Sequence, residues 1–243
     1  MKLIIIRHGD PDYSIDSLTE TGWHEADLLS DRVSKMDVKA FYVSPLGRAR
    51  ATAKATLEKM GREAEVCDWL QEFPIDIKEK NGKKYDTCVW DWYPEIWTKE
   101  PKFYDKDNWA DVPVFEEVEL KKEYDRVVSS LDALLEKHGY KRFDNYYKAV
   151  SPNEDTIVLF CHFGLECVLL SHLLGISPMV LWHGFCAAPT SVTTVVTEER
   201  VKGKAYFRVS AFGDTSHLYA VGEKPSFSAR FCETYDNFDQ RHD

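Results

Sequence analysis

The sequence has no apolar run that approaches the length of a membrane-spanning helix, and its apolar start is cut off at Arg7. A spanning helix needs about 20 apolar residues, and the opening run is too short even for a secretory signal peptide. The six cysteines form no Cys-x-x-Cys pair, and none stands at zinc-ligand spacing from a histidine. We therefore expect a chain of the reducing cytoplasm, with no membrane partner and no bound metal.

Positive charge is also in short supply. Lys and Arg number 31 against 41 Asp and Glu, which gives a formal net charge of −10. This balance argues against a nucleic-acid backbone or an anionic membrane surface as the partner. It does not exclude a small phosphate ester, because a few clustered arginines can set the field of a single pocket.

Apolar and aromatic residues, by contrast, are abundant. They supply 44% and 13% of the 243 residues, enough for the core of one large α/β domain rather than a disordered chain. Strand-like apolar runs occur at 3–6, 40–43, 64–67, 156–161, 191–197 and 205–212, and segments with helical periodicity separate several of them. Such alternation predicts an α/β fold with a largely parallel sheet.

One segment, about 74–118, breaks this rhythm. It lacks a clear period and holds four of the seven tryptophans, namely Trp90, Trp92, Trp97 and Trp109. A long irregular stretch inside a compact domain is typical of a lid or a binding insertion. The alternative is a satellite cluster whose aromatic side chains pack only on each other. We expect a single domain over 1–243 that carries this segment as a lid.

Basic side chains stand where buried strands end. The run Leu3–Ile6 leads directly into Arg7 and His8, and the run 156–161 leads into His162. Because the carboxyl ends of parallel strands meet at one edge of the sheet, these groups are expected to share a crevice. Gly9 lets the backbone turn there and lets a ligand come close. Taken alone, Arg7-His8-Gly9 fits a phosphate site and an accidental strand end equally well.

Arg48 opens the helix that follows a third strand-like run, so its guanidinium and the helix dipole would point at the same edge. Two guanidiniums can hold a tetrahedral dianion through paired hydrogen bonds. Their charge also lowers the pKa of a nearby histidine, which leaves a ring nitrogen free to attack phosphorus. The remaining need is a proton donor for the leaving alkoxide. Glu72 is the best placed carboxyl and Asp10 is the second choice, although a solvated surface carboxylate is an equal explanation of Glu72.

These residues occur in an ordered set that resembles the histidine phosphatase superfamily, the phosphoglycerate-mutase-like proteins. Arg7-His8-Gly9 is similar to the signature of that family. Further similar segments follow in family order: Leu18-Thr19 with Gly22, Ser44-Pro45-Leu46-Gly47-Arg48-Ala49 with Thr52-Ala53, Leu70-Gln71-Glu72, Cys161-His162, and Gly213-Asp214-Thr215-Ser216-His217-Leu218. The matches run over the whole chain except the segment between Pro74 and Val118.

The resemblance implies a three-layer αβα sandwich and a role for each group. His8 would be the nucleophile that becomes a phosphohistidine, and Arg7, Arg48 and His162 would bind the phosphoryl group. Glu72 would protonate the leaving group and then deprotonate the attacking water. No metal and no organic cofactor is implied.

The sequence departs from the family pattern at three places. Phe163 stands between His162 and Gly164, where the family has glycine directly after the histidine. Ser14 stands where many members carry asparagine, and Asp10 replaces the commoner glutamate. Together with Gly9, these positions (Asp10, Ser14 and Phe163) are candidates for a minor part in the pocket.

Three other functions compete with a phosphatase that acts on a small phosphorylated substrate. A phosphoglycerate mutase would share the pocket, but the acidic, Trp-rich stretch after Glu72 does not resemble the mutases. A non-catalytic phospho-ligand binder is kept open by Phe163 and Ser14, yet it would need no nucleophile. A metallohydrolase is disfavoured because two arginines would repel a divalent cation. The tail from Pro225 is a candidate contact with the domain or with a second copy in a homodimer.

Overall fold

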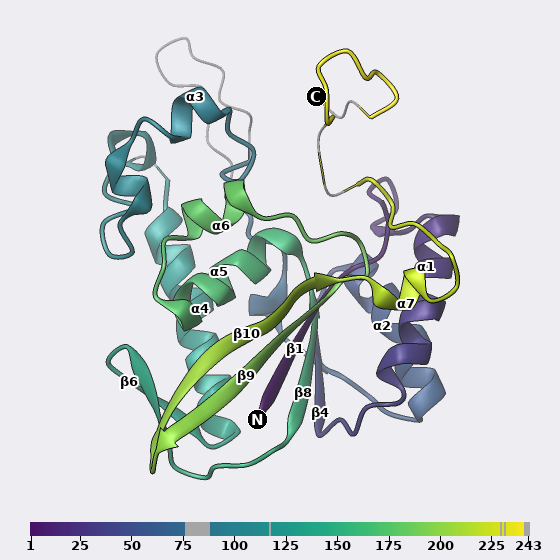
Figure 1. Ribbon diagram of the computed structural model, residues 1–243, viewed down its shortest axis with the longest axis horizontal. Coiled ribbons are helices and arrows are strands. Elements are labelled where there is room, and N and C mark those ends of the chain that lie inside the picture. The colour runs from purple at the N-terminus through teal and green to yellow at the C-terminus, as the bar shows by residue number, and fades with distance from the viewer. Residues whose placement is uncertain (76–87, 117, 229, 231, 241–243) are drawn as a thin grey trace.

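A central sheet of eight strands organises the molecule (Figure 1). The computed structural model describes residues 1–75, 88–116, 118–228, 230 and 232–240. The strand order is β5-β4-β8-β1-β9-β10-β7-β6. The strands are β1 (Lys2–Arg7), β4 (Ala40–Val43), β5 (Glu65–Val66), β6 (Tyr140–Phe143), β7 (Tyr146–Ala149), β8 (Thr156–Cys161), β9 (Val192–Val201) and β10 (Lys204–Asp214). A separate short ribbon pairs β2 (Pro11–Asp12) with β3 (Ser17–Leu18).

The half of the sheet from β5 to β1 is parallel, and the half from β9 to β6 is antiparallel. The predicted α/β architecture is confirmed, and its parallel part is the part that leads into the expected site. β1 lies at the centre because its side chains are buried on both faces: Leu3 and Ile5 belong to one core, and Ile4 and Ile6 to the other. A strand with two covered faces must be apolar throughout, as the opening run is.

Helices cover both faces of the sheet and make the expected three layers (Figure 1). One face carries α1 (Glu20–Val33), α2 (Gly47–Met60) and α7 (Ser216–Tyr219). The opposite face carries α4 (Leu120–Lys137), α5 (Phe163–Leu174) and α6 (Pro178–Gly184). Thr19 caps α1, since its hydroxyl accepts a hydrogen bond from the Gly22 amide at 3.0 Å. Gly61, in a left-handed conformation with φ of 61°, ends α2.

The Trp-rich segment is structured where it is described. It contains α3 (Pro94–Trp97) and the 3₁₀ turns η2 (Pro101–Tyr104) and η3 (Pro113–Phe115), following η1 (Asp68–Leu70). Its aromatic side chains do not pack only on each other, because the Trp109 ring lies edge-on to Tyr124 at 5.2 Å and to Trp182 at 5.8 Å. The segment therefore extends the main core. Its residues 76–87, among them Lys78, Lys80, Lys83 and Lys84, lie outside the described residues.

None of the helices in the described part of the chain combines the length and apolar character needed to cross a membrane.

Candidate active site

The carboxyl ends of β1 and β8 bring the predicted basic groups together. Arg7 is the last residue of β1 and pairs in register with Cys161, the last residue of β8. His8 and His162 come next on the two strands, and their ring centroids lie 5.1 Å apart. Arg48, in the first turn of α2, places its Nε 3.4 Å from His8 Nε2. The structure thus brings these residues together at one edge of the sheet, where Arg7 and Arg48 line a pocket and the two histidines are buried.

His8 is held as a neutral ring with a defined tautomer. Its Nδ1 lies 2.8 Å from the Gly9 carbonyl, which can only accept a hydrogen bond, so Nδ1 carries the proton. Nε2 therefore carries the lone pair, and the Arg48 Nε–H points to it. Burial, followed by the charges of Arg7 and Arg48, holds the pKa of His8 well below its usual range. The nitrogen beside Arg48 is consequently available as a nucleophile at neutral pH.

His162 has the opposite arrangement. Its Nε2 lies 2.8 Å from Ser44 Oγ, whose oxygen accepts a hydrogen bond from the Leu46 amide, so the serine hydroxyl is free to donate to the ring. With the serine as the donor, the His162 proton stands on Nδ1, a buried atom with no hydrogen-bond partner among the described residues. Burial and the neighbouring His8, Arg48 and Arg7 hold the pKa of His162 well below its usual range. The ring is thus a neutral donor.

Backbone carbonyls orient the Arg7 guanidinium. One terminal nitrogen donates to the Ala187 carbonyl at 2.6 Å, and the other lies 3.4 Å from the Ser228 carbonyl in the carboxyl-terminal tail. Arg7 is buried, and its Nε has no hydrogen-bond partner within the described part of the chain. The side chain therefore keeps donor capacity for an anion.

Asp16, which the sequence did not single out, positions Arg48. One Asp16 oxygen accepts from the Arg48 guanidinium at 2.7 Å, and the other accepts from the Gly47 amide at 2.6 Å. Burial acts to raise the pKa of Asp16, but these hydrogen bonds outweigh it and lower the pKa. Gly47 is required here because a Cβ at this position would lie 2.0 Å from the Asp16 carbonyl oxygen. The contact joins the loop before α1 to the start of α2, 31 residues further along the chain, so no local sequence pattern could reveal it.

Glu72 lies close to these cations, on the chain just after η1. Its Oε1 accepts from the Phe73 amide at 2.9 Å and from the Leu165 amide, in the first turn of α5, at 3.0 Å. Burial raises its pKa, while these hydrogen bonds and the charges of Arg7 and Arg48 oppose the rise. The result is a carboxyl with an elevated pKa whose second oxygen is not held by these amides.

The displaced glycine of the second histidine motif supports Glu72. A Cβ on Gly164 would lie 2.9 Å from Glu72 Oε1 and 3.0 Å from two ring carbons of Trp90. No side chain fits there, so the glycine lets the acid reach the amide of Leu165. With Phe163 directly after His162, the glycine is the second residue after the histidine, and it packs against Glu72.

The four minor pocket candidates differ. Phe163 lines the pocket. Gly9 is packed against α1, because a Cβ there would lie 2.8 Å from the Gly22 carbonyl oxygen, so close backbone packing explains the glycine. The Asp10 carboxylate accepts hydrogen bonds from Thr19 and Ser228 and does not line the pocket, whereas Glu72 does. Ser14 is hydrogen-bonded to Asp12 and does not line the pocket.

Two buried carboxyls near the site were also missed by sequence reasoning. Glu25 accepts hydrogen bonds from the amides of Asp10 and Ser226 and so ties the tail to the loop after β1. Glu166, in α5, is buried among apolar side chains, and burial raises its pKa to about 7. A glutamate on an otherwise apolar helix is a signal that could have found it.

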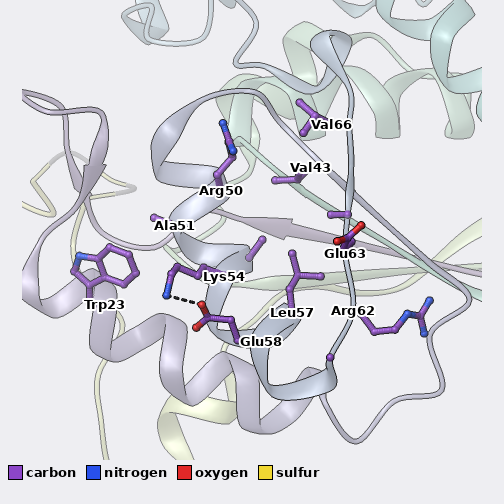
Figure 2. Close-up of a pocket in the computed structure, with 13 residues that line it drawn as sticks. Trp23, Val43, Arg50, Ala51, Lys54, Leu57, Glu58, Arg62, Glu63 and Val66 are labelled. Atoms are coloured by element: carbon purple, nitrogen blue, oxygen red, sulfur yellow. Dashed lines mark ion pairs between the residues drawn. The ribbon is translucent and has the colours of Figure 1, made fainter.

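The pocket has a volume of about 400 Å³. Its walls come from the strand ends, the Trp-rich segment and the tail: Arg7, Tyr13, Arg48, Glu72, Cys88, Trp90, Asp91, Phe163, Ser228 and Arg230. A separate groove of about 640 Å³ lies along α2 and contains none of the predicted site residues. Figure 2 shows that groove, with Trp23 at one end and the ion pair between Lys54 and Glu58, which lie one turn apart on α2. In the described residues there is no group of three or more His, Cys, Asp or Glu side chains that could hold a metal ion.

Comparison with known proteins agrees with this geometry. Residues 3–207 match the histidine phosphatase superfamily (branch 1). The chain belongs to this superfamily. Among curated relatives it is similar to the probable phosphoglycerate mutase GpmB of Photorhabdus laumondii subsp. laumondii, with 29% identity over 91 residues, which are 34% of this chain and 42% of that protein. The match thus spans about two fifths of the relative.

Solved structures of superfamily phosphatases share the fold. A mutant phosphoserine phosphatase from Entamoeba histolytica in complex with phosphoserine has a TM-score of 0.59 at 21% identity, over 89% of this chain and 98% of that one. A mycobacterial glucosyl-3-phosphoglycerate phosphatase has a TM-score of 0.55 at 18% identity, over 88% and 99% of the two chains. At these identities the likeness establishes the fold alone.

Proposed function

We propose that this member of the superfamily is a phosphomonoesterase that works through a phosphohistidine on His8. The observation that carries the proposal is the neutral His8 ring, with its Nε2 lone pair beside Arg48, with His162 next to it, and with Arg7, Arg48 and Glu72 lining one pocket. The lowered pKa of His8 favours the neutral ring that a nucleophile needs, and the raised pKa of Glu72 favours the protonated form that a donor needs. A pocket that only bound phosphate would need neither the nucleophile nor the acid.

In the first step, His8 Nε2 forms a bond to phosphorus while the bond from phosphorus to the ester oxygen breaks. Glu72, whose pKa burial raises, gives its proton to the departing alkoxide. In the second step, Glu72 takes a proton from water as the water oxygen bonds to phosphorus and the bond to His8 breaks. The products are one alcohol and one phosphate, and His8 and Glu72 return to their starting states.

Hydrogen-bond donors in the pocket account for binding and stabilisation of the phosphoryl group. Arg7 and Arg48 supply charge, and His162 Nδ1 supplies a neutral donor with no partner among the described residues. A phosphoryl oxygen would satisfy such a buried donor, which otherwise costs free energy. The charge that develops on the transferring group is therefore matched by donors already in place.

Product partitioning tests the shared intermediate. Benzyl phosphate and p-nitrophenyl phosphate are hydrolysed in water that contains ethylene glycol, and the ratio of phosphate to glycol phosphate is measured. A common phosphohistidine predicts the same ratio for both substrates, because the leaving group has departed before the acceptor attacks. Ratios that differ between the two would contradict the covalent mechanism.

A phosphoglycerate mutase remains the second candidate, since the curated relatives carry that name. Hydrolysis is favoured because the acidic, Trp-rich segment after Glu72 is unlike the mutases. Phosphate release from 3-phosphoglycerate and its isomerisation, each with and without a bisphosphate primer, separate the two. Primer-dependent isomerisation that outpaces phosphate release would replace the phosphatase assignment.

A further inference from the structure

Phe163 and Trp90 are aromatic residues that have no role in the proposed phosphoryl transfer. Phe163 is the residue inserted between His162 and the following glycine, and Trp90 belongs to the irregular segment. Both line the pocket that holds Arg7, Arg48 and Glu72. They come from segments that are far apart in sequence, so their meeting at one pocket is a product of the fold.

Trp90 stands directly beside the acid. Both the Trp90 ring and Glu72 Oε1 pack against Gly164. A Cβ added to this glycine would lie 3.0 Å from two ring carbons of Trp90 and 2.9 Å from the Glu72 oxygen. In the proposed reaction the ester oxygen must come within hydrogen-bond reach of Glu72. The first atoms of the leaving group beyond that oxygen therefore lie within reach of the Trp90 ring.

We propose that Trp90 and Phe163 form an aromatic wall that selects phosphate monoesters whose leaving alcohol carries a flat, apolar ring. The proposal rests on the proposed phosphatase function and names its substrate class. Both side chains are half-buried and pack against the main core, so that one part of each ring is held by the protein while the other faces the pocket. Rings held in this way present an aromatic surface without a large cost of ordering.

The charged groups of the outer pocket do not favour a second anionic group on the substrate. Arg230 is exposed and already pairs with Glu233 at 3.0 Å, and Asp91 is the acidic residue of the same wall. Tyr13, the third aromatic of the pocket, is 68% exposed and has the Arg48 guanidinium 5.4 Å from its ring centroid. Beyond the phosphoryl group, the pocket therefore offers aromatic surface more than net charge.

Benzyl phosphate and propyl phosphate provide a matched pair, because both release a primary alcohol and only one carries a ring. We expect kcat/KM to favour benzyl phosphate by roughly tenfold, the contribution of one ring stacked on an aromatic face. Trp90→Ala should remove most of this preference by lowering kcat/KM for benzyl phosphate while changing that for propyl phosphate less than about threefold. Trp90→Phe and Phe163→Leu should each retain part of it.

Trp23→Ala is the control, since Trp23 is 39% exposed in the separate groove along α2. Binding of the non-hydrolysable benzylphosphonate and propylphosphonate, measured by calorimetry, gives a readout that does not need turnover. The aromatic wall is supported if the protein prefers benzylphosphonate, Trp90→Ala abolishes this preference and Trp23→Ala preserves it. This result does not depend on the phosphatase mechanism, which hydrolysis by His8→Ala would overturn separately. Three results would overturn the aromatic wall. The wild type could bind both phosphonates with equal affinity, or Trp90→Ala could weaken both equally. The third is that 3-phosphoglycerate binds more tightly than benzylphosphonate and that this tighter binding depends on Arg230.

Discussion

The floor of the pocket and its rim are built in different ways. The floor is our name for Arg7 and Arg48 together with the buried histidines His8 and His162, which lie at strand ends and in the first turn of a helix. The rim consists of Tyr13, Trp90, Phe163, Ser228 and Arg230, which come mainly from loops, the irregular segment and the tail. The floor carries the groups proposed for the phosphoryl chemistry, and the rim carries the aromatic side chains proposed to meet the leaving group. The reaction should therefore depend on the floor and the choice of substrate on the rim.

The largest effect is expected at the nucleophile. His8→Ala should lower kcat for every phosphate ester by about 10⁴-fold or more, because the proposed covalent intermediate forms on His8. Steady-state hydrolysis of p-nitrophenyl phosphate measures it. His24→Ala changes an exposed histidine of α1 and should leave activity and melting temperature unaltered. Residual activity within tenfold of wild type in the His8 variant would remove the distinction between floor and rim.

Glu72 lies where floor and rim meet, so its effect should depend on the leaving group. Glu72→Gln should lower kcat/KM, which reports only the first step, by roughly 10²- to 10⁴-fold with propyl phosphate and much less with p-nitrophenyl phosphate, whose phenolate leaves without a proton. The raised pKa also fixes a sign: activity on alkyl esters should fall as pH rises through the pKa of Glu72, and the Gln variant should lack that limb. Equal losses for both esters would show that Glu72 is not the proton donor.

Arg48→Lys tests whether catalysis depends on the planar, forked guanidinium of Arg48 or only on its positive charge. The lysine keeps the positive charge but loses the paired hydrogen bonds to the phosphoryl group and to Asp16, and we expect a loss of roughly ten- to a hundredfold in kcat/KM. Arg50→Lys, on an exposed position two residues further along α2, is the matched control. If both variants behave alike, the geometry around His8 Nε2 has no part in catalysis.

A change at the buried Glu166 should have the smallest effect on turnover but a clear effect on stability. Its folded pKa of about 7 lies above the ordinary 4.5, so the folded protein keeps a proton that the unfolded chain releases. Stability is therefore highest below pH 4.5 for this group and is lost as pH rises to about 7, by up to about 3 kcal/mol. Glu166→Gln should remove that dependence in urea unfolding at pH 5 and pH 8. Glu58→Gln, an exposed control in α2, should follow the wild type.

Much of the floor could be predicted from the sequence because its signals are local. Buried apolar runs end in Arg7-His8 and in His162, and parallel strands bring their carboxyl ends to one edge. The partners of these residues could not be predicted, because Asp16, Ser44 and Ala187 meet them only after folding. The hairpin of β6 and β7 was also missed, although its turn at Asp144 has the positive φ that short polar residues adopt.

The rim was foreseen only in outline. A Trp-rich segment outside the strand–helix rhythm indicated a lid, but which tryptophans fill the core and which one faces the pocket depends on tertiary packing. Trp109 is buried, whereas Trp90 lines the pocket. The tail was expected to dock on the domain or on a partner, and Ser226 and Ser228 hold it to Glu25, Asp10 and Arg7. A homodimer and a cytoplasmic location stay predictions.

Trapping the phosphoenzyme tests the central claim most directly. The protein is mixed with a phosphate ester, quenched in alkali within one turnover, and mapped by peptide mass spectrometry for acid-labile phosphate. The mechanism predicts a single phosphoryl group on the peptide that contains His8, attached at Nε2, and none in His8→Ala. A wild-type enzyme that turns over substrate but carries no phosphoryl group at His8, or carries it on another residue, would contradict the account.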